Sequence, residues 1–234
     1  MPKAAPTNKH EAKLRKAGHR LIAGVDEAGK GSWAGPLVTA AVILDETDLP
    51  VGLFDSKALT PTQRERAFVV IAKKALAWSV QVVSVQDIDK HGVHKANLAG
   101  LKQAVEKLNV SPDAVLVDAF KIQVADAPVV NVIDGDALER TISAASILAK
   151  VTRDRLMSSE INREFPHFHF HVHKGYGTPL HQKLLTMHGP TAAHRMSFAP
   201  VKAAAHTKSK KKPIKKKSTR PKSRPKKSAR RTRR

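Results

Sequence analysis

The sequence predicts an α/β protein in which a central mixed β-sheet is flanked by helices and followed by a small, more helical C-terminal region. Short apolar runs of strand length fill the first half of the chain, helical patterns stand between some of them, and a long helical pattern follows. The chain has 234 residues, 41% of them hydrophobic, which is enough for one domain with a packed core and short appendages.

The predicted elements rest on apolar periodicity and on helix start signals. Residues 36–44 are almost entirely apolar, which predicts a strand buried on both faces. Thr60 and Pro61 supply a capping hydroxyl and a first-turn proline, which predict the start of a helix. In chain order, we expect strands at 19–26 and 36–44, a helix from Thr60 to Trp78, a strand at 80–85, a helix at 94–108, strands at 114–118 and 129–133, and a helix at 138–159.

The first predicted strand ends in two adjacent carboxylates, Asp26 and Glu27, inside a stretch with glycines at positions 24, 29, 31 and 35. Glycines let a backbone come close to a ligand, so the pattern favours a metal and a phosphodiester. A solvated turn is the simpler alternative. A nucleotide-binding P-loop also matches from Gly24 to Lys30, but it fails at Gly31, where a hydroxyl should hold magnesium. With a metal bound, the two acids become ligands instead of unfavourable charges.

Further acids follow later strands. Asp118 ends the predicted strand at 114–118, as Asp26 ends the first one, and Asp136 comes shortly after the strand at 129–133. Each alone is an ordinary strand-end acid. Carboxylates at the ends of neighbouring strands can converge, and such a group repels itself unless a cation is present. Two cations about 4 Å apart could then activate water and neutralise a leaving oxygen.

The positive charge is concentrated at the C-terminus. Residues 202–234 hold 17 of the 42 Lys and Arg residues and none of the 20 acids, which leaves a body with 25 basic and 20 acidic residues. We expect three segments: a flexible basic arm at 1–17, a folded domain at 18–201 with a helical C-terminal part, and a disordered basic tail at 202–234 that binds nucleic-acid backbone. A tail that only aids solubility is the alternative. With no cysteine, apolar leader or membrane span, we expect a cytoplasmic protein that does not bind membranes. We also expect a monomer.

Several longer motifs resemble the ribonuclease HII family, the type 2 ribonucleases H. The resemblance spans about residues 20–201, with the motifs in the family's order. They are Gly24-Val25-Asp26-Glu27-Ala28-Gly29-Lys30-Gly31, Asp55-Ser56-Lys57, Val117-Asp118, Gly135-Asp136, the stretch 143–154, Lys174-Gly175-Tyr176-Gly177-Thr178 and the stretch 194–200.

The resemblance implies a ribonuclease H-like fold and a Mn²⁺- or Mg²⁺-dependent endonuclease. Its substrates would be the RNA strand of RNA–DNA hybrids and duplex DNA with single ribonucleotides, nicked on their 5′ side to leave 3′-OH and 5′-phosphate ends. The metal ligands and catalytic residues carry over onto Asp26, Glu27, Asp118 and Asp136. The substrate-binding residues carry over onto Gly29, Lys30, Gly31, Ser56, Lys57 and Tyr176, with Lys150 and Asp154 as support.

The chain departs from the family pattern at two positions. Lys30 stands where the family usually has arginine, which keeps main-chain contacts to a ribose 2′-OH but loses a planar, bidentate fork. Asp134 replaces the usual lysine before Gly135 and removes a positive charge near the metals. Either change could alter metal affinity or rate, but neither removes a ligand.

Four histidines, His167, His169, His171 and His173, alternate with other residues. In an extended segment they would lie on one side and could bind zinc or nickel, although a basic loop near the DNA backbone explains the run as well.

Two other classes of function stay open from sequence. A nucleic-acid packaging protein would bind without turnover, and another metal nuclease of the same fold superfamily, such as a resolvase or integrase relative, would lack the loop and tyrosine motifs.

Overall fold

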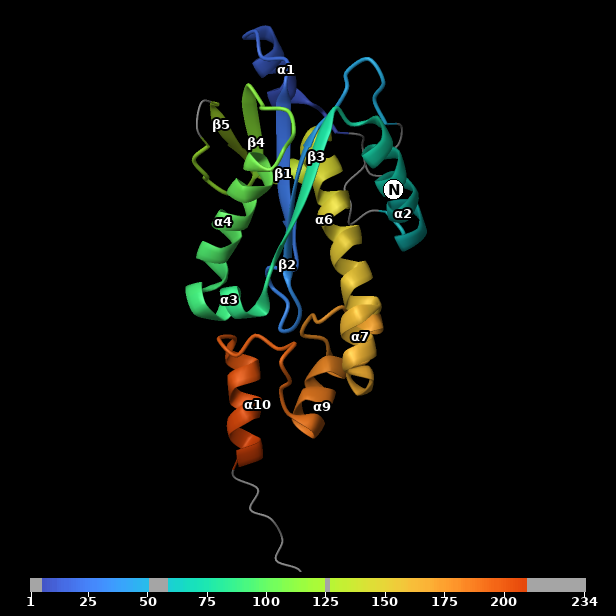
Figure 1. Ribbon diagram of the computed structural model, residues 1–234, viewed down its shortest axis with the longest axis vertical. Coiled ribbons are helices and arrows are strands. Elements are labelled where there is room, and N and C mark those ends of the chain that lie inside the picture. The colour runs from blue at the N-terminus through green and yellow to red at the C-terminus, as the bar shows by residue number, and fades with distance from the viewer. Residues whose placement is uncertain (1–5, 51–58, 125–126, 210–234) are drawn as a thin grey trace, which may run out of the picture.

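A computed structural model describes residues 6–50, 59–124 and 127–209 (Figure 1). The elements follow one another as α1 (Lys9–Lys16), β1 (Ile22–Ala28), β2 (Leu37–Ile43), α2 (Pro61–Lys74), β3 (Ala77–Val83), α3 (Val85–His91), α4 (Val93–Glu106), β4 (Ala114–Asp118), β5 (Val129–Val132), α5 (Gly135–Leu138), α6 (Arg140–Ser158), α7 (Glu160–Glu164), the 3₁₀ helix η1 (Pro166–Phe168), α8 (Phe170–His173), α9 (Pro179–His188) and α10 (Ala199–Ser209).

The described strands form one mixed sheet in the order β3-β2-β1-β4-β5. β1 pairs antiparallel with β2 and parallel with β4, and β4 pairs parallel with β5. Helices α2 and α6 cover one face and α4 the other, as Figure 1 shows. The predicted fold class, a mixed sheet flanked by helices, is therefore confirmed.

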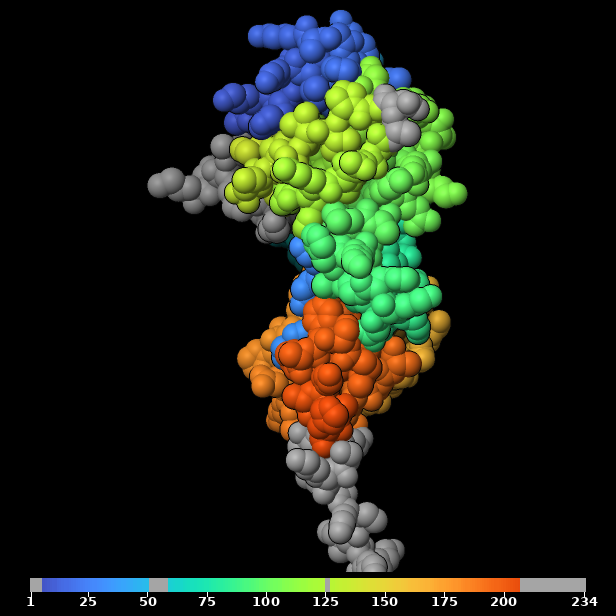
Figure 2. Space-filling model, turned by 90° about the vertical axis from the view of Figure 1, so that its left-hand side faces the viewer, coloured from blue at the N-terminus to red at the C-terminus, as the bar shows by residue number. Residues whose placement is uncertain are grey.

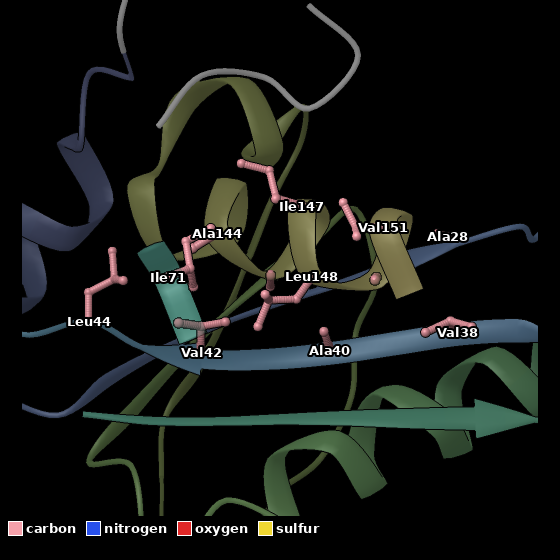
Figure 3. Packing of buried hydrophobic residues seen from close by; sticks show 12 residues of the cluster. Ala28, Val38, Ala40, Val42, Leu44, Ile71, Ala144, Ile147, Leu148 and Val151 are labelled. Carbon is pink, nitrogen blue, oxygen red and sulfur yellow. The ribbon is translucent and has the colours of Figure 1, made fainter. Parts of the chain in front are cut away.

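Strand β2 builds a core on both of its faces because its side chains alternate in direction. Val38, Ala40 and Val42 pack against α6 on one face (Figure 3), while Ala41 and Ile43 pack on the α4 side. Burial of each valine or isoleucine contributes about 1.5–3 kcal/mol. The prediction that this apolar run forms a strand buried on both faces is thus confirmed.

Helix α6 lies directly on β1 because Gly24 has no side chain. A Cβ at this position would come 2.1 Å from the carbonyl carbon of Thr141, closer than real contacts allow. This close approach brings the next turns of α6 beside the end of β1, where Asp26 lies. Gly24 therefore helps to position the functional site even though it carries no chemistry.

Several predicted boundaries were wrong, and one helix was missed. The helix from Thr60 ends at Lys74 instead of Trp78, because Ala75 adopts an extended conformation and Trp78 already pairs with β2. The helix α3 was missed, since its seven residues are too few to show a helical period. The long helix predicted from 138 begins at Arg140, because Glu139 is extended and separates α5 from α6.

The N-terminal residues are not a flexible arm throughout 1–17, as the sequence had suggested. Helix α1 is docked on the start of α6 by reciprocal capping. Glu139, fully buried, accepts hydrogen bonds from the main-chain N–H groups of His10 and Glu11 at 3.0 and 3.1 Å. Glu11 in turn accepts from the main-chain N–H of Thr141 at 2.8 Å. Each helix therefore supplies the cap of the other.

This capping predicts a loss of stability in Glu139→Gln. The amide turns one acceptor into a donor that faces N–H groups, so we expect the free energy of unfolding to fall by about 1–3 kcal/mol. Urea denaturation measures the change. Glu106→Gln is the matched control, because its ion pair with Lys102 is exposed and contributes less than about 1 kcal/mol. Equal stability of the two variants would contradict the capping role.

The C-terminal region forms a second, smaller core of helices below the sheet (orange in Figure 2). Asp89 of α3 ties it to the sheet domain by accepting from the main-chain N–H groups of Met196 and Ser197 at 2.8 and 2.9 Å. Helix α10 continues to Ser209, so disorder does not begin at residue 202 as predicted. The remainder of the predicted tail lies outside the described residues. None of the helices described here is long and apolar enough to cross a membrane.

Candidate active site

The register of the parallel strands brings two of the predicted acids together. Val25 of β1 is paired with Val117 of β4, so Asp26 and Asp118 follow at the same level of neighbouring strands. Both line one pocket together with Glu27. The convergence of strand-end acids that the sequence suggested is therefore present for these three residues.

Burial and like charge make this acidic group unfavourable on its own. Asp26 is 5% exposed, and its pKa is raised well above the usual range by burial and then by the charges of Glu27 and Asp118. Hydrogen bonds from the Ser146 hydroxyl and from the main-chain N–H of Glu27, the latter at 2.7 Å, act in the opposite direction. Because the effects that raise the pKa of Asp26 are larger than those that lower it, a cation bound nearby would stabilise the ionised carboxylate.

The fourth predicted acid, Asp136, is placed beside the pocket rather than in its lining. It is buried on the short helix α5. The preceding residue, Gly135, donates its main-chain N–H to Oδ1 of Asp118 at 2.7 Å, which fixes α5 to the end of β4. Asp134, one of the departures from the family pattern, precedes α5 in a left-handed conformation with φ of 55°.

The glycine loop and the tyrosine border the same pocket as the acids. Gly29, Lys30, Lys150 and Tyr176 all line it. The Lys30 ammonium lies 4.0 Å from the centre of the Phe120 ring, so in this structure it contacts an aromatic face. Of the other predicted contacts, Gly31 is exposed at the loop, and Ser56 and Lys57 lie outside the described residues.

The two residues predicted as support form an ion pair along α6. Lys150 Nζ lies 2.8 Å from Asp154 Oδ1, and the same ammonium lies 5.3 Å from the centre of the Tyr176 ring. Lys150 therefore reaches the pocket, whereas Asp154 contacts Lys150 and does not line the pocket itself. Ser146 was missed in the sequence, although its spacing of four residues before Lys150 places both on one face of a helix and could have indicated it.

The histidine run is not an extended ladder, so the geometry proposed for a zinc or nickel site was wrong. Phe168 and Phe170 are both fully buried, and the chain turns through η1 and α8 to bury them, with His169 in a left-handed conformation. His173 consequently turns into the core, whereas His167, His169 and His171 remain exposed.

His173 instead joins His181 and His194 in a buried group that holds the tyrosine loop. His181 Nδ1 lies 2.9 Å from the carbonyl oxygen of Tyr176, and His181 Nε2 lies 3.1 Å from His194 Nε2. The main-chain N–H of Gly175 donates to His173 Nδ1 at 3.2 Å. A ring nitrogen that donates to a carbonyl leaves the other nitrogen as an acceptor, so this arrangement suits neutral imidazoles.

Neutral buried histidines predict lower stability in acid. Burial lowers the pKa of His181 to about 4 and that of His194 to about 3, whereas unfolded histidines titrate near 6.5. Between these values the unfolded chain binds more protons, so the free energy of unfolding should fall as pH decreases from about 6.5 to 4. Urea denaturation across this range should show a shallower decline in His194→Gln than in the wild type. The exposed-site control His91→Gln should keep the wild-type slope, and a wild-type slope in His194→Gln would refute this account.

The donor set fits a hard divalent cation, because carboxylate oxygens are the ligands that such ions prefer. Among the described residues, no three Asp, Glu or His side chains are already gathered as a metal cage. The acids border a shared pocket instead of closing around one point, and burial, with repulsion from Glu27 and Asp118 added to it, raises the pKa of Asp26.

Together these features define the class of protein. The mixed five-stranded sheet and its flanking helices superpose on the ribonuclease H2 of Pyrococcus horikoshii with a TM-score of 0.73, which shows a ribonuclease H-like fold. That match has 27% sequence identity and covers 82% of this chain and 100% of the other.

The chain belongs to the ribonuclease HII family and is therefore a hydrolase of the ribonuclease H class. The family model for ribonuclease HII matches residues 23–201. Ribonuclease HII of Acidothermus cellulolyticus is 48% identical over 84% of this chain, which spans only 64% of that relative's length. Ribonuclease HII of a Nocardioides species is 46% identical, with 84% of this chain and 82% of that protein covered.

Proposed function

We propose that this protein is a divalent-metal-dependent endoribonuclease that hydrolyses the RNA strand of RNA–DNA hybrids and nicks duplex DNA on the 5′ side of single ribonucleotides. The observation that carries the proposal is one pocket in which three strand-end acids, one buried and two half-buried, meet a glycine loop and an aromatic ring. The products would have 3′-OH and 5′-phosphate ends. Family membership supports the hybrid as substrate.

Asp26, Glu27, Asp118 and Asp136 are the residues that we propose as metal ligands. A bound pair of Mg²⁺ or Mn²⁺ ions would supply an activated water and neutralise the charge of the leaving oxygen. The Ser146 hydroxyl would hold Asp26 in place for this role, and the main-chain N–H of Gly135 would hold Asp118. Two fixed acids on adjacent strands provide a rigid base for the site.

The remaining pocket residues would orient the nucleic acid. Lys150 provides a positive charge beside the acids and suits a backbone phosphate. The ring of Tyr176 offers a face on which a sugar can pack, and the loop at Gly29 and Lys30 allows main-chain groups to approach a ribose. We propose that the basic residues beyond 209 add affinity for any duplex through phosphate contacts.

The test compares three labelled duplexes under the same conditions: an RNA–DNA hybrid, a DNA duplex with one ribonucleotide, and an all-DNA duplex. With Mg²⁺ or Mn²⁺, the first two should be cut and the third should not, and EDTA should stop the reaction. Binding to all three without any cleavage would instead support the packaging protein. Efficient cleavage of the all-DNA duplex would support a different nuclease of this fold.

A further inference from the structure

Two arginines that the site has not used lie buried behind the glycine loop. Arg153 comes from α6 and Arg195 from the segment between α9 and α10, and both side chains are fully buried. Neither guanidinium forms an ion pair with a carboxylate within the described part of the chain. Buried charges without a counter-charge are costly, so a fold that keeps two of them calls for an explanation.

The hydrogen bonds of both arginines converge on one short segment. Arg153 donates from Nε to the carbonyl oxygen of Pro36 at 2.9 Å and from Nη2 to that of Ala34 at 3.1 Å. Arg195 donates from Nε to the carbonyl oxygen of Gly35 at 3.0 Å. Their acceptors are neutral carbonyl groups of the loop that leads from β1 to β2. The two guanidinium groups therefore hold this loop from its buried side.

Three further hydrogen bonds connect the arginines, directly or through Ser32, to the carbonyl groups at the tip of this loop. Arg195 Nη1 donates to the carbonyl oxygen of Lys30 at 2.9 Å. Arg153 Nη2 donates to the Ser32 hydroxyl at 2.7 Å, and that hydroxyl donates to the carbonyl oxygen of Gly29 at 2.7 Å. The carbonyl oxygens of both Gly29 and Lys30 are therefore held toward the buried arginines.

Peptide geometry then fixes the direction of the neighbouring N–H groups. In a trans peptide the C=O and the following N–H point in opposite directions, and the described backbone has no cis bond. The N–H groups of Lys30 and Gly31 must therefore point away from the arginines. Within the described chain, neither of these N–H groups donates to another protein group. They remain available as a pair of donors beside the pocket.

The packing of Arg153 depends on Gly29. A Cβ at Gly29 would lie 1.8 Å from Nε of Arg153, and the φ of 92° at this glycine is one that other residues rarely adopt. The same guanidinium lies 5.1 Å from the centre of the Tyr176 ring. Arg153 thus contacts both the glycine loop and the tyrosine, which are the two parts of the pocket that we propose to contact the sugar.

We propose that Arg153, acting through Ser32, and Arg195 are positioning residues that turn the N–H groups of Lys30 and Gly31 toward the 2′-oxygen of a ribonucleotide. This inference rests on the proposed function. The arginines touch neither the substrate nor the reacting atoms. They act by fixing the carbonyl groups of Gly29 and Lys30. The N–H groups on the opposite side of the same two peptides then become preorganised donors.

The test uses Ser32→Ala and Arg195→Lys in the full chain. Ser32→Ala removes the hydroxyl that links Arg153 to Gly29, and Arg195→Lys keeps the charge but loses the planar fork. Ser79→Ala is the matched control, because Ser79 is also buried and donates to the main-chain oxygen of Ala104. Affinities for a one-ribonucleotide duplex and for the same all-DNA duplex are measured in Ca²⁺, and thermal unfolding confirms that each variant is folded.

The informative quantity is the ratio of the two affinities, since a partly unfolded sample lowers both affinities equally and leaves their ratio unchanged. We expect the wild type and Ser79→Ala to prefer the ribonucleotide duplex, and Ser32→Ala and Arg195→Lys to lose about three- to tenfold of that preference. A wild-type ratio in either folded variant would overturn the inference for the arginine on that path. If the wild type itself shows no preference, the proposed function fails first, and the inference fails with it.

Discussion

Asp118→Asn is expected to abolish cleavage, with a rate at least about a thousandfold below that of the wild type, because a metal-ligand charge is lost from the centre of the site. Asparagine keeps the oxygen that accepts from the N–H of Gly135, so α5 should stay in place. Binding to an RNA–DNA hybrid should change by less than about threefold. Single-turnover cleavage and binding anisotropy measure the two quantities on one preparation.

Asp113→Asn provides the control for this change, because Asp113 precedes the same strand at its opposite end and accepts from the main-chain N–H of Arg20 at 2.7 Å. It should cleave at close to the wild-type rate. Turnover in Asp118→Asn within tenfold of the wild type would remove Asp118 from the proposed ligands.

Tyr176→Ala is expected to lose about ten- to hundredfold of its activity on a duplex with one ribonucleotide, whereas Tyr176→Phe should keep most of it. The estimate follows from burying an aromatic ring against a sugar, worth about 1.5–3 kcal/mol. Alanine keeps the main-chain oxygen that contacts His181, so the loop should stay in place. Initial rates on one-ribonucleotide and hybrid duplexes measure the effect.

Trp78→Ala serves as the control, because Trp78 is a partly exposed aromatic residue on the edge strand β3 and does not line the acidic pocket. Its rates on both duplexes should match the wild type. An alanine variant at Tyr176 with the wild-type rate and preference would exclude the ring from sugar recognition.

The parts of the site that depend on strand register could be predicted from sequence. Asp26 and Asp118 each end an apolar run, and parallel neighbours place such ends side by side. The strand Ala114–Asp118 was predicted with its observed bounds. The strands of the sheet and the long helix α6 could also be predicted, because the strands are uninterrupted apolar runs and the helix has a long apolar periodicity.

What the sequence did not reveal depends on tertiary contacts between distant segments. Arg153 and Arg195 lie in two of the motifs that resemble the family, but nothing in the local pattern shows that they are buried, and the role that we propose for them follows only from the approach of both to the loop at Gly29. The prediction of an extended histidine segment failed for a related reason. Burial of Phe168 and Phe170 requires the chain to turn, so the alternating histidines do not lie on one side. Glu11 looked like part of a polar arm because its acceptor role requires the start of α6.

The most direct test of the proposed site and function is the position of the cut in a DNA duplex with one ribonucleotide. The wild type with Mg²⁺ or Mn²⁺ should make a single nick on the 5′ side of the ribonucleotide and leave 3′-OH and 5′-phosphate ends, as resolved on a sequencing gel with end-specific enzymes. A cut on the 3′ side, a 2′,3′-cyclic phosphate end, or undiminished cleavage in EDTA would contradict a metal-dependent hydrolysis centred on Asp26, Glu27, Asp118 and Asp136.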